Sequence, residues 1–89
     1  APMARLVNSL IVDAVNKRAS DIHIESLENE CQVRYRVDGM LRLATTIPKA
    51  AEPALISRIK VISGLDIAER RKPQDGRTDL RVGDREVDL

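Results

Sequence analysis

The spacing of apolar residues changes abruptly near residue 19, and this change most restricts the folds open to the chain. From Met3 to Val15, apolar residues recur every three or four positions, which is the spacing of one face of an α-helix. From Ser20 to Glu25, the sequence SDIHIE instead alternates polar and apolar residues, as a strand with one buried face does. The sequence therefore predicts an N-terminal helix over about residues 3–18, followed directly by a half-buried strand.

A hairpin is expected next. Gln32–Val37 alternates in the same way, so its valines and Tyr35 are expected in the core while Arg34 and Arg36 face outward. Asp38-Gly39 is typical of a type I′ turn, which needs positive φ at both central positions. Met40–Thr46 is then the partner strand.

The second half of the chain predicts a helix and another hairpin. Ala51–Gly64 has helical spacing and a proline in its first turn. Strands are expected at about Arg77–Val82 and Arg85–Leu89, joined by a turn at Gly83-Asp84. The predicted order is α-β-β-β-α-β-β, an α+β domain with helices packed on one face of an antiparallel sheet.

Composition excludes several classes of function. The 89 residues suffice for one small domain, and Phe and Trp are absent, which removes the aromatic platform that binds single-stranded nucleic acid. Fifteen basic and fourteen acidic residues give a net charge of +1. A charge so close to zero does not indicate binding to DNA or to an anionic membrane. Cys31 is the single cysteine, and no apolar run is long enough to span a bilayer. We expect a soluble cytoplasmic domain, and its ends suggest a piece of a longer protein.

No residues form a convincing catalytic or metal site. Asp21, His23 and Glu25 share one strand face, but alternate residues on a strand lie roughly 6–7 Å apart, whereas zinc ligands converge on one ion. The pattern favours a polar strand face. The glycines do not form the G-x-x-x-x-G-K-[ST] frame of a phosphate-binding loop.

Arginine is the unusual residue type. Arg34 and Arg36 project from one strand, and the connection from Asp66 to Arg77, DIAERRKPQDGR, carries more. These charges could form a solvated surface, because exposed ion pairs contribute only about 0–1 kcal/mol. They could also form an interface for acidic groups or phosphate, which a planar guanidinium binds well. The residues alone leave both interpretations open.

Three segments together resemble a known family. ASDIHIE, VRYRVDGMLR and LISRIKVISGLDIAERRKPQDGR occur in an order and spacing similar to those of the ATPases that assemble type II secretion systems and type IV pili. The resemblance covers residues 1–89. It implies a single PAS-like domain of the N2 type, the domain that precedes the RecA-like motor, with the motor domain lying beyond Leu89.

The resemblance also implies a role without catalysis. Such a domain packs on the motor domain of its own and of the neighbouring subunit in a homo-hexamer, and passes nucleotide-driven motion to an inner-membrane platform protein. ATP and Mg would belong to the parent protein, so this fragment is expected to be inactive, with no catalytic, cofactor-binding or metal-binding residue and no nucleic-acid partner. The expected interface residues are Arg34, Arg36, Arg70, Arg71, Gln74, Asp75 and Arg77.

Three alternatives remain open from the sequence. A PAS-like domain could sense a small ligand or bind another protein, although an aliphatic core offers few converging polar groups. A small α+β sheet could bind RNA, which the near-zero net charge opposes. An independent enzyme is the third alternative, and no converging set of catalytic residues favours it.

Overall fold

The structure, a computed structural model, describes residues 2–63, 68–72 and 76–82, and for 63 and 68–72 it describes the backbone alone. The elements follow in chain order. They are α1 (Pro2–Asn16), β1 (Asp21–Ser26), β2 (Glu30–Val37), β3 (Met40–Pro48), the 3₁₀ helix η1 (Lys49–Ala51), α2 (Glu52–Ser63), β4 (Ala68–Lys72) and β5 (Arg77–Arg81).

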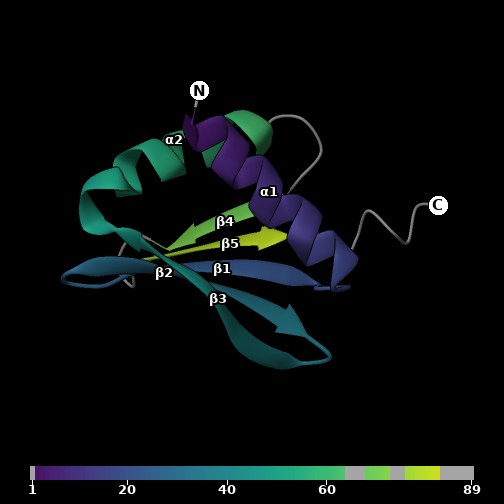
Figure 1. Cartoon of the computed structure of the whole chain (residues 1–89). Helices are drawn as coiled ribbons and strands as arrows, with labels where there is room; N and C mark the ends of the chain where they lie inside the picture. Colours follow the sequence, from purple (N-terminus) through teal and green to yellow (C-terminus); the bar gives the residue numbers. More distant parts are fainter. Residues whose placement is uncertain (1, 64–67, 73–75, 83–89) are drawn as a thin grey trace.

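The strands form one sheet in the order β3-β2-β1-β5-β4, and every described pairing is antiparallel. The first strand in the sequence is therefore the central strand of the sheet. Helices α1 and α2 lie over the same face (Figure 1), so no helix of the described residues covers the opposite face. The predicted α+β class, with helices on one face of an antiparallel sheet, is confirmed.

Helix α1 begins at Pro2, where the missing N–H of proline costs no helical hydrogen bond. Its C-terminus is a Schellman motif: the Ala19 N–H donates to Ala14 O at 2.9 Å, and the Arg18 N–H donates to Val15 O at 3.0 Å. Arg18 holds the left-handed position of this motif with φ = 60°. The helix consequently ends before Arg18, slightly earlier than the spacing predicts.

The core lies between the helices and the sheet. Its largest fully buried side chains are aliphatic and come from both layers, including Ile22 of β1, Leu55 and Ile59 of α2, and Leu80 of β5. Tyr35, the lone aromatic residue, is 2% exposed, and its hydroxyl donates to Leu10 O of α1 at 3.0 Å. That bond fixes the helix over β2 and satisfies a polar group that would otherwise be costly to bury.

The first hairpin forms as predicted. Asp38 and Gly39 have φ values of 53° and 80°, which are the two positive values that a type I′ turn requires. The β2–β3 register then shifts between Val33 and Arg34, so that Ala44 is an extra residue in β3. Strand β3 ends at Pro48, two residues beyond the predicted Met40–Thr46.

The prediction for residues 66–77 was wrong in one respect. Ala68–Lys72, expected to lie in a connection, is strand β4, and it pairs with β5. The second hairpin therefore contains β4 and β5, whereas its predicted turn at Gly83-Asp84 and strand at Arg85–Leu89 lie outside the described residues. The physical reason is that an edge strand can be charged on both faces, which hides the alternation that reveals a half-buried strand.

Neither helix in the described part of the chain has the length and apolar character that crossing a bilayer requires.

Candidate functional site

The sheet face opposite the helices carries most of the charged residues singled out from the sequence. We call it the open face. Residues paired across neighbouring strands lie on the same face, so the register arranges it in rows. The central row runs Asp79–His23–Arg34–Leu43, and the rows beside it run Arg81–Asp21–Arg36–Leu41 and Arg77–Glu25–Gln32–Thr46.

The centre of the open face is a hydrogen-bonded pair. His23 Nδ1 lies 2.7 Å from Asp79 Oδ1, and the two side chains are 18% and 21% exposed. The other ring nitrogen, Nε2 of His23, is buried without a partner in the described part of the protein. The pair joins β1 to β5 by side chains as well as by the backbone ladder.

The two acids of β1 lie between basic or amide groups. In the register, Asp21 has Arg36 on one side and Arg81 on the other, and Glu25 has Gln32 and Arg77. Alternation of charge across neighbouring strands is favourable, and like charges in these positions would repel. The described residues contain no group of three side chains able to hold a metal ion, and His23 instead bonds Asp79.

Arg34 and Arg36 are brought together on β2, as predicted. Both are half-buried on the open face. Arg34 donates to Gln32 Oε1 at 2.6 Å, and Arg36 donates to the Gly39 carbonyl at 3.0 Å. Neither arginine forms an ion pair with any described residue. These neutral partners hold the guanidinium groups in place, and Asp21 is the described carboxylate opposite Arg36 in the register.

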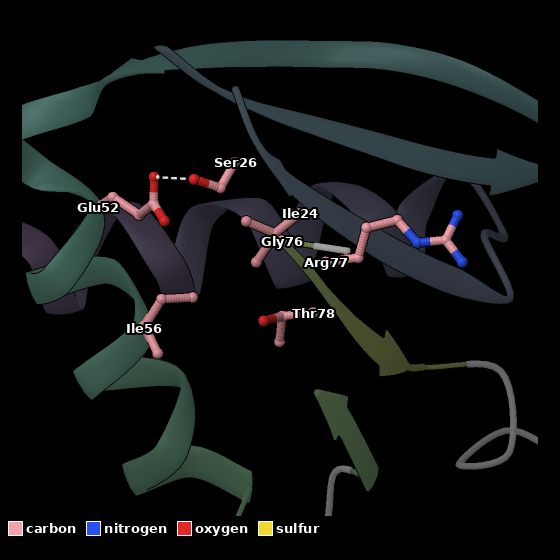
Figure 2. Close-up of a pocket in the computed structure, with 7 residues that line it drawn as sticks. All are labelled: Ile24, Ser26, Glu52, Ile56, Gly76, Arg77 and Thr78. Carbon is pink, nitrogen blue, oxygen red and sulfur yellow. Dashed lines mark hydrogen bonds between the residues drawn. The ribbon is translucent and has the colours of Figure 1, made fainter. Parts of the chain in front are cut away.

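Arg77 lies on the other side of β1. It is the first residue of β5, it is exposed, and it pairs in register with Glu25. The close-up in Figure 2 shows its guanidinium directed away from Ser26 and Glu52. Arg77 therefore contributes to the same face as Arg34 and also lines the pocket beside the start of β5.

The remaining predicted interface residues are placed in part. Arg70 pairs in register with Asp79, and Arg71 pairs with Thr78. Asp79 belongs to the open face, whereas Thr78 is 5% exposed beneath the helices, so the two arginine positions belong to different faces of the sheet. Gln74 and Asp75 lie outside the described residues.

A cavity of about 250 Å³ lies where α2 meets the ends of β1 and β5. Ser26 Oγ donates to Glu52 Oε1 at 2.8 Å across it (Figure 2), and Lys49 Nζ bonds Ser26 Oγ and lies 3.0 Å from Glu52 Oε1. The polar groups of this cluster thus satisfy one another. The remaining lining is mixed, with Ile24 and Ile56 beside Gly76, Arg77 and Thr78.

Beneath this cluster lies Cys31, which is completely buried. Burial, with a smaller contribution from the nearby Glu52 carboxylate, raises the pKa of the Cys31 thiol to about 11. A thiol with so high a pKa is protonated at neutral pH and is a poor nucleophile. Cys31 therefore acts as a small core residue.

Sequence reasoning missed two features of this face. It did not pair His23 with Asp79, because strand periodicity does not reveal which distant strand becomes a neighbour. It also missed that Leu41 and Leu43, which are 44% and 52% exposed, extend the rows of Arg36 and Arg34. The sequence MLRL after the hairpin turn could have identified the two leucines. Its apolar residues do not follow a strict alternation, so some of them must be exposed.

Comparisons with known proteins agree on one family. The profile of the family described as "Type II/IV secretion system protein" matches residues 1–89. A "Type II secretion system protein E" of Xanthomonas campestris pv. campestris is 56% identical over 89 residues, which are 100% of this chain and 16% of that protein.

Two further relatives match over the same 89 residues. "Type II secretion system protein HxcR" of Pseudomonas aeruginosa is 53% identical, covering 100% of this chain and 19% of the relative. A "Type II secretion system protein E" of Klebsiella pneumoniae is 52% identical, covering 100% and 18%. The chain thus spans less than a fifth of the length of the curated relatives that it matches.

Proposed function

Because the chain belongs to the type II/IV secretion system protein family, we propose that it is a non-catalytic domain of a hexameric ATPase that powers type II secretion or type IV pilus assembly. The domain packs on the motor domains of its own and the neighbouring subunit. It transmits their nucleotide-driven motion toward an inner-membrane platform protein. ATP and Mg bind the motor domain, and the assembly works at the cytoplasmic side of the inner membrane.

The open face is the observation that supports this role. Both described helices lie on one side of the sheet, so no described helix occupies the side that we assign to a partner. Arg34 and Arg36 lie there with neutral hydrogen-bond partners and no ion pair among the described residues. Arginine is enriched in protein interfaces because it combines apolar contact with several directed donors. A neighbouring subunit that presents carboxylates would complete these two groups.

The β4–β5 hairpin provides the second part of the proposed interface. Arg70 lies in register with Asp79 of the open face, and Arg77 begins β5 on that face. We include Arg71, Gln74 and Asp75 of the same segment in the proposal, as the sequence predicts. Motion is then transmitted by the whole domain, because both parts of the interface belong to one hydrogen-bonded sheet.

The test is charge reversal on β2 in the intact protein. Arg34→Glu with Arg36→Glu is expected to weaken subunit association by about tenfold or more, since opposite charges across an interface become like charges. Sedimentation velocity measures hexamer formation, and ATPase rate and secretion in cells report function. Arg5→Glu with Lys60→Glu is the matched control, because both residues are exposed and lie on the helices.

A second pair of variants examines the hairpin. Arg70→Ala and Arg71→Ala, singly and combined, should reduce ATPase rate and secretion if the segment contacts a neighbouring subunit. If the β2 double variant and the combined β4 variant both fold, form hexamers, hydrolyse ATP and secrete as the wild type does, the proposed function of this domain is wrong.

A further inference from the structure

The two edges of the sheet differ sharply in character. Strand β4, at one edge, has the sequence AERRK, in which four of five residues are charged. Strand β3, at the other edge, has the sequence MLRLATTIP, in which Arg42 is the one charged residue. Soluble proteins protect open strand edges with charges, because an unprotected edge pairs with other chains. The β4 edge has this protection, and the β3 edge has very little.

The residues of β3 are also exposed in an unusual way. Met40 is 60% exposed, Leu41 44% and Leu43 52%. They occupy both faces of the strand, because neighbouring residues point to opposite sides. Among the described residues, β3 pairs with β2 alone, so its outer backbone edge has no strand beside it. The outer edge of the sheet thus combines unpaired backbone groups with apolar side chains.

The charges beside Met40–Leu43 are mainly positive, and the exposed acidic residue next to them is Asp38 of the β2–β3 turn. A cavity of about 460 Å³ lies where the end of α1 meets the β2–β3 hairpin, with Tyr35, Val37 and Ala44 among its lining and Lys17 and Arg42 as its charged groups. Lys17 is bound to Asp13 at 3.1 Å, whereas Arg42 forms no ion pair with any described residue. Leu43 also lines this cavity; in the register it is paired with Arg34, and Leu41 is paired with Arg36. Strand β3 itself contains no acidic residue.

From this combination we propose that β3 is the docking edge for an extended, acidic segment of a partner protein, which adds as a further strand to the sheet. Main-chain hydrogen bonds to the outer edge of β3 provide affinity, and alternate side chains of the segment provide specificity. Apolar residues of the segment contact Leu41 and Leu43, and its carboxylates, which alternate with them, pair with Arg42. This inference is independent of the proposed function, because any acidic extended segment would satisfy it.

A second copy of the chain fits this edge less well. Two β3 strands brought side by side would present one cation each and no anion, so their charges would repel. An acidic strand meets the same edge with attraction, and this complementarity decides between the two occupants.

The test uses a synthetic peptide and the intact protein. The probe is a fluorescent nine-residue peptide, the length of β3, in which valine alternates with aspartate or glutamate. Fluorescence anisotropy measures its affinity. We expect Leu43→Lys to weaken binding by about tenfold or more. Val61→Lys, which replaces an equally aliphatic residue that is 56% exposed on α2, should bind as the wild type does.

Two changes test the two parts of the proposal, which are strand addition and charge pairing. A peptide N-methylated at alternate residues cannot form the full ladder of hydrogen bonds and should bind about tenfold less tightly. A peptide with lysine in place of its acids should not bind the wild type, but it should bind Arg42→Glu more tightly than the acidic peptide does. Circular dichroism shows whether Arg42→Glu is folded.

Several outcomes would overturn the proposal. Equal affinity of the acidic peptide for the wild type and Leu43→Lys would remove β3 as the site, and equal affinity of the N-methylated peptide would remove strand addition. The proposal is also overturned if the peptide does not bind and Leu43→Lys abolishes self-association, measured by sedimentation. The same holds if the peptide does not bind and Leu43→Lys abolishes binding to phosphatidylglycerol vesicles. Those results would assign the edge to a second copy or to a membrane.

Discussion

Nδ1 of His23 lies 2.7 Å from Oδ1 of Asp79, and this contact joins residues 56 positions apart in the sequence. It crosses the junction between the central strand β1 and strand β5, the single place where the β4–β5 hairpin pairs with the rest of the described sheet. Both side chains are more than three-quarters buried. The pair therefore contributes to the stability of the connection between the early and late parts of the chain.

We predict that a double-mutant cycle of His23→Ala and Asp79→Ala gives a coupling free energy of about 1 kcal/mol, the net value of one part-buried hydrogen bond. Urea unfolding at neutral pH measures it. The Asp13–Lys17 pair is the matched control, since its side chains are 47% and 58% exposed, and exposed helical pairs contribute about 0.3–0.5 kcal/mol. Equal coupling in the two cycles would contradict the assigned importance of the His23–Asp79 contact.

The C-terminus of α1 offers a stabilising substitution. Arg18 has φ = 60° in the Schellman motif, a conformation in which Cβ is strained and glycine is not. We expect Arg18→Gly to raise the free energy of unfolding by about 0.5–1 kcal/mol. Arg5→Gly, at an exposed position inside the same helix, should lower it by about 1 kcal/mol. A destabilising Arg18→Gly would mean that the arginine makes a contact worth more than the strain.

Two glycines with positive φ should respond differently to alanine. A Cβ at Gly76 would lie 3.3 Å from Ser26 O and 3.4 Å from Ser26 Cβ, whereas nothing lies within 4 Å of one at Gly39. Both variants incur backbone strain of about 1 kcal/mol. Gly76→Ala additionally disturbs the 2.7 Å bond from the Ser26 N–H to Gly76 O. Thermal unfolding should therefore show a larger loss for Gly76→Ala than for Gly39→Ala, and the reverse order would contradict this description of the β1–β5 end.

Alkaline solution should destabilise the fold through Cys31. Burial raises the pKa of its thiol from 9.0 to about 11 in the folded protein. Between these values the unfolded chain loses a proton that the folded chain keeps, so the free energy of unfolding falls as pH rises from about 9 to about 11. Cys31→Ala should lower stability at neutral pH by leaving a small cavity, and its pH slope in this range should be shallower.

A control variant separates the effect of Cys31 on the pH dependence of stability from the effect of Tyr35. Burial, together with Asp13, raises the pKa of Tyr35 to about 12, so Tyr35→Phe should reduce the slope at the upper end of the alkaline range. An unchanged slope in Cys31→Ala would show that the thiol does not titrate differently in the two states.

Local pattern was enough to predict much of the fold. Ile22, Ile24 and Tyr35 are buried and Arg34 and Arg36 face outward, because alternation along one strand follows from backbone geometry alone. The turn at Asp38-Gly39 was equally predictable, since few residue pairs tolerate two positive φ values.

Pairing between distant strands was not predictable in this way. Nothing in the period of Asp21–Ser26 indicates that its second neighbour is β5, so the contact of His23 with Asp79 could not be foreseen. Strand β4 was missed because its residues are charged, as edge strands often are. Of the candidate site, the β2 arginines were placed correctly, Arg70 and Arg71 belong to different faces, and the roles of Gln74 and Asp75 stay predictions.

The central position of β1 has a consequence for how the protein is made. β2 and β3 follow β1 closely in the chain, so these three strands can assemble as soon as they leave the ribosome. The opposite side of β1 waits for β5, which is synthesised more than 50 positions later, and closing so long a loop is entropically slow. Until then, a nascent chain exposes the backbone edge of its innermost strand, and this interval is when the protein is most open to aggregation or to a chaperone.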